Sequence, residues 1–345
     1  MIREIQVRDN RPKLSKRWNR LLQAAILVVS YGFIYHQVFS ENGMHQMTTL
    51  LDQFFMLGSE KILVAVILAL MVLNWTTETI KWKFLVRRIE AIRFSVAIEA
   101  VLTGITISTF TPNRIGEYFG RAFILKKANP VEAIILTIVG SISQLLVTVL
   151  MGTLALLLLL PQFALHAGSW PAFFYPGIIT FIMLFDAMLI LLYLNVGAIR
   201  PLSRYLLKQH WRKAYRYVGV ISRINRSGLA YVLMLSFLRY GIFFIQFFIA
   251  LRLFGVLISL KDAVLLLPVI YLVLAVVPTI ALTELGVRGS VVIYVIGTFF
   301  TLRGSMPGQW DTALLSAATL IWIINLAFPA IVGAWFVFKL RFIRR

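Results

Sequence analysis

Residues 103–121 combine hydroxyl groups, arginines and a carboxylate inside an otherwise apolar region. Arg114 and Arg121 suit a phosphate group, because a guanidinium binds phosphate through two parallel hydrogen bonds. Gly116 and Gly120 would let the backbone or a bound group approach closely, since glycine has no side chain. Groups that can hydrogen-bond to headgroup oxygens or to freed backbone groups come from Thr106, Ser108, Thr109, Thr111 and Asn113. The stretch therefore predicts a binding site for an acidic lipid headgroup.

The charged part of this stretch has a counterpart in the second half of the chain. Glu117-x-x-x-Arg121 recurs as Glu284-x-x-x-Arg288. This spacing is common for helical ion pairs, so coincidence is the alternative to an internal duplication. The chain has only 14 acidic residues, and both copies follow a proline-containing break, which favours duplication. Each pair could merely lock local structure, but ionisable residues at membrane depth are costly and usually functional.

Four more ionisable residues lie within apolar segments: Glu78, Lys81, Asp186 and Arg239. We expect Asp186 and Arg239 to pair with each other, because pairing lowers the cost of burying both charges; a proton- or substrate-linked role is the alternative. Glu78 and Lys81 lie near a helix end beside two tryptophans, a pattern typical of interfacial anchoring. Their alternative role is a cytoplasmic entrance for a headgroup.

The composition places the chain among polytopic membrane proteins. It is 60% hydrophobic and 14% charged, with a mean hydropathy of +0.85, whereas about 25% of residues in soluble domains are charged. The absence of cysteine excludes disulfides and thiolate metal sites. The four histidines lack metal-ligand spacing and no nucleotide motif occurs, so we expect no metal and no cofactor. The net charge of +20 lies beside apolar segments without a nucleic-acid-binding motif, so we expect no nucleic-acid partner.

The apolar runs predict an all-α membrane domain that occupies residues 1–345. Two regions, 95–125 and 262–302, are each broken near the middle by proline and polar residues. The uninterrupted runs predict six full crossings, at 21–39, 60–84, 131–160, 172–195, 228–251 and 311–338. The first run is too long for a signal peptide and lacks a cleavage pattern, so we expect it to be retained.

The two broken regions have arms that are short for a membrane crossing. At about 1.5 Å per residue, 96–112 and 114–125 would measure ~25 and ~18 Å, and 263–277 and 289–301 ~22 and ~20 Å. A hydrocarbon core is about 30 Å thick. These lengths predict two re-entrant helical hairpins.

The distribution of basic residues supports the hairpins. If 95–112 were a full crossing, Lys126, Lys127 and the basic loop 196–227 would lie outside the cell, against the positive-inside rule. With two hairpins, the cytoplasmic segments hold 28 of the 34 lysines and arginines, in 1–20, 81–93, 113–130, 196–227 and 339–345. We therefore expect a multi-pass protein of a bacterial inner membrane with both termini in the cytoplasm.

The order of segments is the same in residues 1–165 and in residues 166–345: two crossings, a hairpin and a third crossing. An odd number of crossings per half means that the second half must be inverted relative to the first. Inverted halves with discontinuous helices are a recurring plan of transporters. The second helix of each hairpin would begin deep in the membrane, after Pro112 or Pro278, where its free N–H groups favour an anion.

Pro112-Asn-Arg-Ile-Gly-Glu117 with Arg121 behind it, and Glu284-Leu-Gly-Val-Arg288, resemble motifs of the flippase-like family. That family is also called the lysylphosphatidylglycerol synthase transmembrane region, and the resemblance spans about residues 15–340. It implies eight membrane segments and a role in moving lipids, of which aminoacylated phosphatidylglycerol is the best-understood cargo. The sequence ends directly after the last crossing, so we expect no aminoacyltransferase domain.

The leading hypothesis is a flippase for an anionic phospholipid or a polyprenyl-phosphate-type lipid. The arginines would hold the phosphate while the inverted halves expose the site to one leaflet at a time. Proton carriers could be Glu117, Glu284 or Asp186. The alternatives are an accessory membrane subunit of a lipid or cell-envelope enzyme and, with less support, an intramembrane headgroup transferase. Expected partners are membrane lipids with anionic headgroups, and either a second copy of the chain or a separate lipid-modifying enzyme.

Overall fold

The computed structural model describes eleven helical elements and contains no strand within the residues it describes. These residues are Leu21, Ala24, Val28, 61–109, 111, 114–167, 174–196, 219–277, 281–304 and 310–338. The expected crossing 21–39 lies almost wholly outside them, as do Asn113 and the prolines at the two breaks, Pro112 and Pro278. The all-helical membrane fold is confirmed.

The helices are α3 (Lys61–Val86), α4 (Phe94–Ser108), α5 (Gly116–Ile124), α6 (Pro130–Ala167), α7 (Phe174–Leu194), α10 (Arg226–Leu253), α11 (Leu260–Val276), α12 (Ala281–Leu302), α13 (Trp310–Trp322), η4 (Ile323–Ala327) and α14 (Phe328–Val337). Six stretches among the described residues are long and apolar enough to cross a membrane. Five of them match predicted crossings. The sixth lies in α12, which is longer than the arm predicted for 289–301 because its helix already begins at Ala281.

Capping residues explain where two of these helices begin. The Asn225 side chain accepts a hydrogen bond from the backbone N–H of Gly228 at 3.0 Å, at the start of α10. Ser259 accepts one from the N–H of Asp262 at 3.1 Å, at the start of α11. Such bonds satisfy donors that the first turn leaves free. Both short polar residues therefore fix the points at which the chain re-enters an apolar segment.

The helices α4 and α5 form the first hairpin. Glu90, before α4, accepts hydrogen bonds from the backbone N–H groups of Lys127 and Ala128, after α5, both at 2.7 Å. The chain therefore enters and leaves this pair at the same end. The two helices come very close together at Gly104 and Gly120, where a Cβ on Gly120 would lie 2.7 Å from the Gly104 Cα.

The helices α11 and α12 form the second hairpin. Asp262, in the first turn of α11, pairs with Arg303, directly after α12, at 2.8 Å. This pair too is entered and left at one end. That either hairpin is re-entrant in a membrane, and that the two halves are inverted repeats, both stay predictions.

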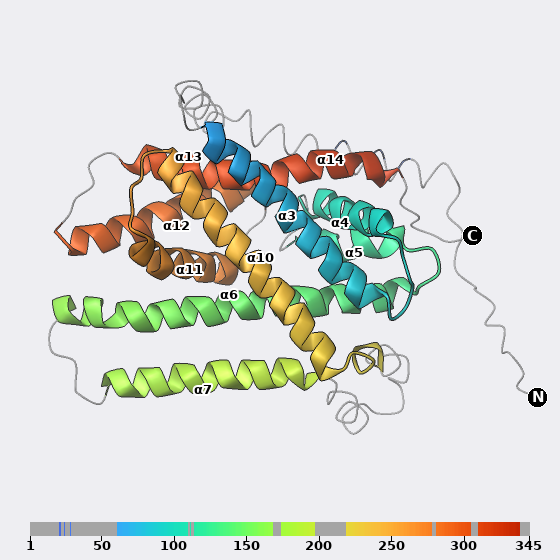
Figure 1. Cartoon of the computed structure of the whole chain (residues 1–345), viewed down its shortest axis with the longest axis horizontal. Coiled ribbons are helices and arrows are strands. Elements are labelled where there is room, and N and C mark those ends of the chain that lie inside the picture. Colours follow the sequence, from blue (N-terminus) through green and yellow to red (C-terminus); the bar gives the residue numbers. More distant parts are fainter. Residues whose placement is uncertain are drawn as a thin grey trace, which may run out of the picture.

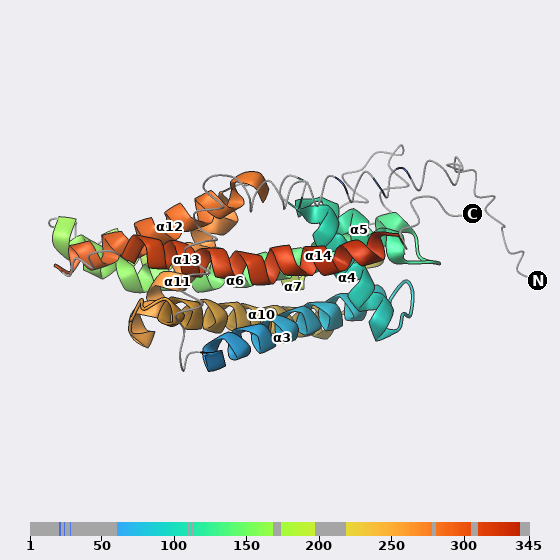
Figure 2. The same ribbon diagram turned by 90° about the horizontal axis from the view of Figure 1, so that it is seen from above.

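The two hairpins lie at opposite ends of the long axis (Figure 1). The helices α13, η4 and α14 run along the length of the molecule, beside both hairpins (Figure 2). The helices α4 and α5 lie at one end of the molecule. The chain reaches this end at the last residues of α3, α7 and α14, and it leaves this end at the first residues of α6 and α10 (Figure 1). The basic residues that directly follow α3 and α5 therefore lie at this end, and that it faces the cytoplasm stays a prediction.

Buried apolar side chains join the hairpins to the long helices. One cluster packs α11 and α12 against α3, α10 and α13, and a second packs α4 and α5 against α3 and α14. The helix α7 lies at the edge, against α6 and α10, and leaves most of its surface exposed. The helices α3 and α6 contribute buried residues to all three apolar clusters and so link the two ends of the molecule.

The contact between α14 and α4 predicts a strong effect of one methyl group. A Cβ on Gly333 would lie 2.2 Å from the carbonyl oxygen of Leu102. We expect Gly333→Ala to destabilise the protein by about 1–3 kcal/mol, the usual cost of overpacking. The matched control is Gly297→Ala in α12, where the added Cβ meets no atom within 4 Å. It should be neutral or slightly stabilising, because alanine favours helix. Equal thermal midpoints of the two variants in detergent would contradict the packing.

The positions of the hairpin ends predict a labelling pattern. The chain has no cysteine, so single-cysteine variants need no prior substitution. We expect Lys126→Cys, after the first hairpin, to react with an impermeant maleimide only from the cytoplasmic side. Arg303→Cys, after the second hairpin, should react only from the opposite side. Labelling of both from one side would overturn the arrangement.

Candidate functional site

Glu78 on α3 binds three cations with one buried carboxylate. Its Oε1 accepts a hydrogen bond from Arg121 Nη1 of α5 at 2.8 Å. Its Oε2 lies 2.8 Å from Lys81 Nζ and 2.9 Å from Arg239 Nη1 of α10. Glu117 also binds Arg121, through the i, i+4 contact that its spacing predicts. We call these five residues the Glu78 cluster.

The cluster shows that Glu78 and Lys81 are not interfacial anchors. Their side chains are only 5% and 2% exposed. Trp82, the neighbouring tryptophan, is also buried and donates its indole N–H to Thr137 at 3.0 Å. The interpretation from sequence was wrong because the charges face the inside of the bundle, where basic residues of two other helices meet them.

The expected pair of Asp186 and Arg239 is not formed. Arg239 points toward α3, where it binds Glu78 and donates from Nε to the Asn74 side chain at 2.8 Å. Asp186 lies on the peripheral helix α7 and accepts a hydrogen bond from Thr153 of α6 at 2.8 Å. The prediction failed because α7 packs on α6, whereas the Arg239 guanidinium turns into the bundle.

A chain of buried amides extends the Glu78 cluster and was missed from the sequence. Asn74 donates to Asn325 at 3.0 Å, Asn325 donates to Gln246 at 3.2 Å, and Gln246 donates to the carbonyl of Ile67 at 3.1 Å. Asn325 lies in η4, a π-helical turn, and such turns are frequent at functional sites. In the sequence, the sign that could have revealed these residues was the presence of single amide side chains within apolar runs.

The turns of the two hairpins meet through charged side chains. Glu284 Oε1, at the start of α12, accepts a hydrogen bond from Arg114 Nη2 at 2.6 Å and another from Arg288 Nη2 at 3.0 Å. The second contact is the i, i+4 pair that the spacing predicts. The first joins the two halves of the chain across 170 residues. We call this set the tip contact.

The backbone around Arg114 is built for a tight turn. Its φ of 57° is the only positive value of a non-glycine residue among those described. Thr111 Oγ1 accepts a hydrogen bond from the N–H of Gly116 at 2.8 Å, and a Cβ on Gly116 would lie 2.4 Å from the Ile107 carbonyl oxygen. This turn leaves the Arg114 side chain 46% exposed, whereas that of Arg121 is 3% exposed.

The predicted headgroup residues therefore fall into two groups. Arg114, Glu284 and Arg288 line a cavity, while Arg121 is enclosed between two carboxylates. The hydroxyls of Thr106, Ser108 and Thr109 bind backbone carbonyls, one of the two roles that the sequence left open. These bonds run from Thr106 to Ala330, from Ser108 to Ile105 and from Thr109 to Thr106, at 2.7 to 2.8 Å.

The cavity at the tip contact has a volume of about 550 Å³. Its lining combines polar side chains with apolar ones, and Leu274, Ala275 and Val276 of this lining belong to the last turn of α11. It is lined by Arg114, Gln144, Thr148, Tyr240, Phe243, Tyr271, Leu274, Ala275, Val276, Val277, Glu284 and Arg288. The Phe243 ring also lies 5.2 Å from the Arg239 guanidinium, which places the cavity beside the Glu78 cluster.

The charge of this region favours an anion. Five basic and three acidic side chains take part in the Glu78 cluster and the tip contact, which leaves a formal charge of +2. Uncompensated charge at membrane depth is costly, so a phosphate bound there would lower the electrostatic energy. No group of three metal-ligating side chains occurs within the described residues.

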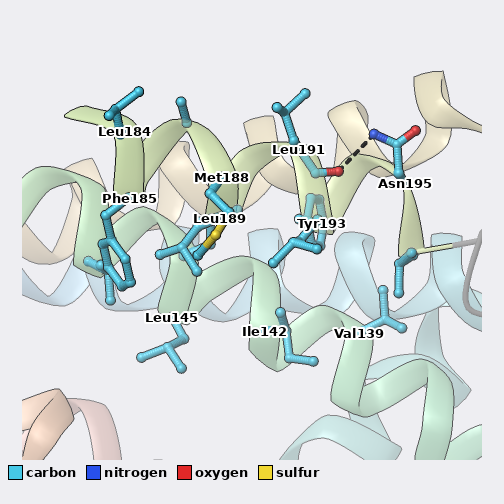
Figure 3. A pocket seen from close by; sticks show the side chains of 15 residues that line it. Val139, Ile142, Leu145, Leu184, Phe185, Met188, Leu189, Leu191, Tyr193 and Asn195 are labelled. Carbon is cyan, nitrogen blue, oxygen red and sulfur yellow. Dashed lines mark hydrogen bonds between the residues drawn. The ribbon is translucent and has the colours of Figure 1, made fainter. Parts of the chain in front are cut away.

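A larger groove of about 1010 Å³ lies between α6 and α7 (Figure 3). Aliphatic and aromatic side chains such as Ile142, Leu145 and Phe185 line it. Its polar groups lie at one end, at Tyr193 and Asn195 (Figure 3). Such a lining suits hydrocarbon rather than a charged group, so the groove is no candidate for headgroup binding.

The helical fold and the buried charges define a polytopic membrane protein that holds an ionic cluster inside its bundle. Residues 21–333 match the family described as the lysylphosphatidylglycerol synthase TM region, and the chain belongs to that family. No curated protein matches the chain, and no solved structure does.

The Glu78 cluster predicts a large loss of stability when its central carboxylate is removed. We expect Glu78→Gln to destabilise the protein by about 3–5 kcal/mol, because it leaves buried cations without their shared partner. The matched control is Asp311→Asn, which removes an exposed carboxylate at the start of α13. Thermal unfolding of both variants in the same detergent measures the difference. A midpoint for Glu78→Gln equal to that of the control would refute the role of the cluster.

Proposed function

We propose that this protein moves a lipid with an anionic phosphate headgroup, of phospholipid or polyprenyl-phosphate type, between the two leaflets of its membrane. The observation that carries the proposal is the cavity at the tip contact. It joins Arg114 and Arg288, from the two halves of the chain, at one carboxylate. Family membership supports a membrane role in lipid biology.

The cavity meets the physical needs of such a substrate. A phosphate cannot enter hydrocarbon alone, because desolvation of its charge is too costly. Arg114 and Arg288 each carry guanidinium N–H groups beyond the one spent on Glu284, and these can replace water around the phosphate. The apolar residues of the lining, among them Leu274 and Val276, can contact the first part of the acyl chains.

The tip contact also suits a site that opens to one side at a time. Arg114 belongs to the first hairpin and Glu284 to the second, so a shift of either hairpin changes the cavity. In many transporters discontinuous helices form the substrate site, and movement of one repeat against the other opens that site to each side in turn. Arg121, which is enclosed, would then hold the first hairpin in place rather than touch the lipid.

The other assignments are proposals of the same kind. We place the protein in a bacterial inner membrane, with the end that carries α4 and α5 in the cytoplasm. A role without catalysis is favoured, since the carboxylates of Glu78, Glu117 and Glu284 are each bound to a cation, which suits binding better than acid–base work. An accessory subunit remains the second candidate, and the following experiment separates it from a flippase.

Lipid movement in proteoliposomes tests the proposal. We expect purified protein to move a fluorescent anionic phospholipid between leaflets, and Arg288→Ala to slow this movement about tenfold or more. A hydrogen bond to a charged group contributes about 1.5–3 kcal/mol, which corresponds to such a factor. The matched control is Arg303→Ala, which removes an arginine of an exposed ion pair outside the cavity.

The two variants should differ in transport but not in their elution from a sizing column. Wild-type vesicles in which the lipid stays in its original leaflet would contradict transport. If Arg288→Ala moves the lipid between leaflets as fast as the wild type, the cavity takes no part in transport, and the accessory role is favoured.

A further inference from the structure

Asp186 is an acidic residue inside an apolar helix, and no cation lies beside it. At 1.5 Å per residue it is about 18 Å from the start of α7 and about 12 Å from its end. No lysine, arginine or histidine within the described residues pairs with it. Glu117 and Glu284, the other two carboxyl groups that the sequence offers as proton carriers, are each bound to an arginine. Because an unpaired charge at membrane depth is costly, Asp186 is the one of the three that is best suited to hold a proton.

The ionisable groups of the helices packed against α7 do not bind Asp186. On α6, at 1.5 Å per residue, Glu132 lies about 30 Å before Thr153 along the helix, and His166 lies about 20 Å after it. On α10, Arg239 turns into the bundle. The other ionisable residues of α10 and α7 are Arg226, Tyr231, Tyr240, Arg252, Tyr175 and Tyr193. Within the described structure, the polar group bonded to Asp186 is the hydroxyl of Thr153.

The hydroxyl of Thr153 lies within hydrogen-bond distance of three oxygens. Its Oγ1 is 2.8 Å from the carbonyl oxygen of Val149, 3.1 Å from that of Leu150 and 2.8 Å from Asp186 Oδ2. A hydroxyl has a single proton to donate, but it can also accept. Thr153 can fully donate to Asp186 only if it donates to neither carbonyl. If a protonated Asp186 donates to Thr153 instead, Thr153 can donate to Val149, and both 2.8 Å contacts are hydrogen bonds.

The second oxygen of Asp186 distinguishes these two arrangements. Oδ1 is buried and has no hydrogen-bond partner within the described structure. In an ionised carboxylate, this oxygen would carry charge with neither a donor nor a cation beside it. In a neutral acid it is an uncharged carbonyl oxygen, and burying it costs much less. The contacts of both oxygens therefore favour the neutral acid.

We propose that Asp186 is a proton-binding site, at which a neutral carboxylic acid donates to Thr153 and can release its proton. Its neighbours in the sequence, Phe185 and Ala187, line the apolar groove between α6 and α7. Release of the proton would leave a charged carboxylate beside this groove. Proton binding therefore stabilises the contact between α6 and α7. The inference goes beyond the proposed function and does not depend on it.

Carbon-13 NMR of the aspartate carboxyl groups tests the proposal on the full chain in bilayer nanodiscs. The chain has five aspartates, and Asp186→Asn identifies the Asp186 resonance by removing it. At pH 7 we expect this resonance at the position of a protonated carboxyl. Asp262, which is paired with Arg303, should give the resonance of an ionised one. As the pH is raised, the Asp186 resonance should move to the ionised position, because the proton leaves.

Threonine variants test the hydrogen bond between the two helices. Thr153→Val removes the acceptor and should shift the Asp186 resonance at pH 7 without moving it to the ionised position. Thr153→Ser keeps the hydroxyl and should preserve the wild-type resonance. The matched control is Thr180→Val, which removes a hydroxyl of α7 that donates to the Pro176 carbonyl at 2.9 Å. It should leave the Asp186 resonance unchanged.

Three results would contradict the proposal. An Asp186 resonance at the ionised position at pH 7 would overturn the neutral acid. A proton that stays bound at every pH at which the protein remains folded would refute an exchangeable site. Equal responses to Thr153→Val and Thr180→Val would refute the bond to Thr153. Lipid movement enters none of these measurements, so a failure of the proposed function would not affect them.

Discussion

One buried carboxylate holds three cations of this membrane protein together, and the arrangement of its helices depends on it. Glu78 neutralises Lys81 on its own helix, Arg121 on the first hairpin and Arg239 on α10. Each of these cations would be costly inside a bilayer without it. The carboxylate therefore joins three segments that are far apart in the sequence.

The position of the candidate site follows from this constraint. Arg121 ties α5 to α3, which fixes the turn that presents Arg114. Arg114 then reaches Glu284 in the second half of the chain, and the cavity opens beside that contact. In the transport that we propose, the contact between the two hairpin turns would change, while the Glu78 cluster would stay intact.

Much of the fold could be predicted from apolar run length, because a span needs about 20 apolar residues whatever its neighbours are. The crossings at 60–84 and 131–160 agree closely with α3 and α6. The i, i+4 ion pairs were also predictable, since helical geometry alone brings such residues together. Gln144 and Tyr240 were not recognised, because one amide or phenol in an apolar helix carries no sign of which way it faces.

The sequence by itself determined that the chain is a helical membrane protein, where most of its helices lie and that Glu284 would pair with Arg288, because these depend on local hydropathy and spacing. Only the tertiary structure decided which charges meet across helices. It placed Arg239 at Glu78 instead of Asp186, and it joined Arg114 to Glu284. The reason is physical: a partner on another helix depends on the rotation of both helices, and packing of the whole bundle sets that rotation.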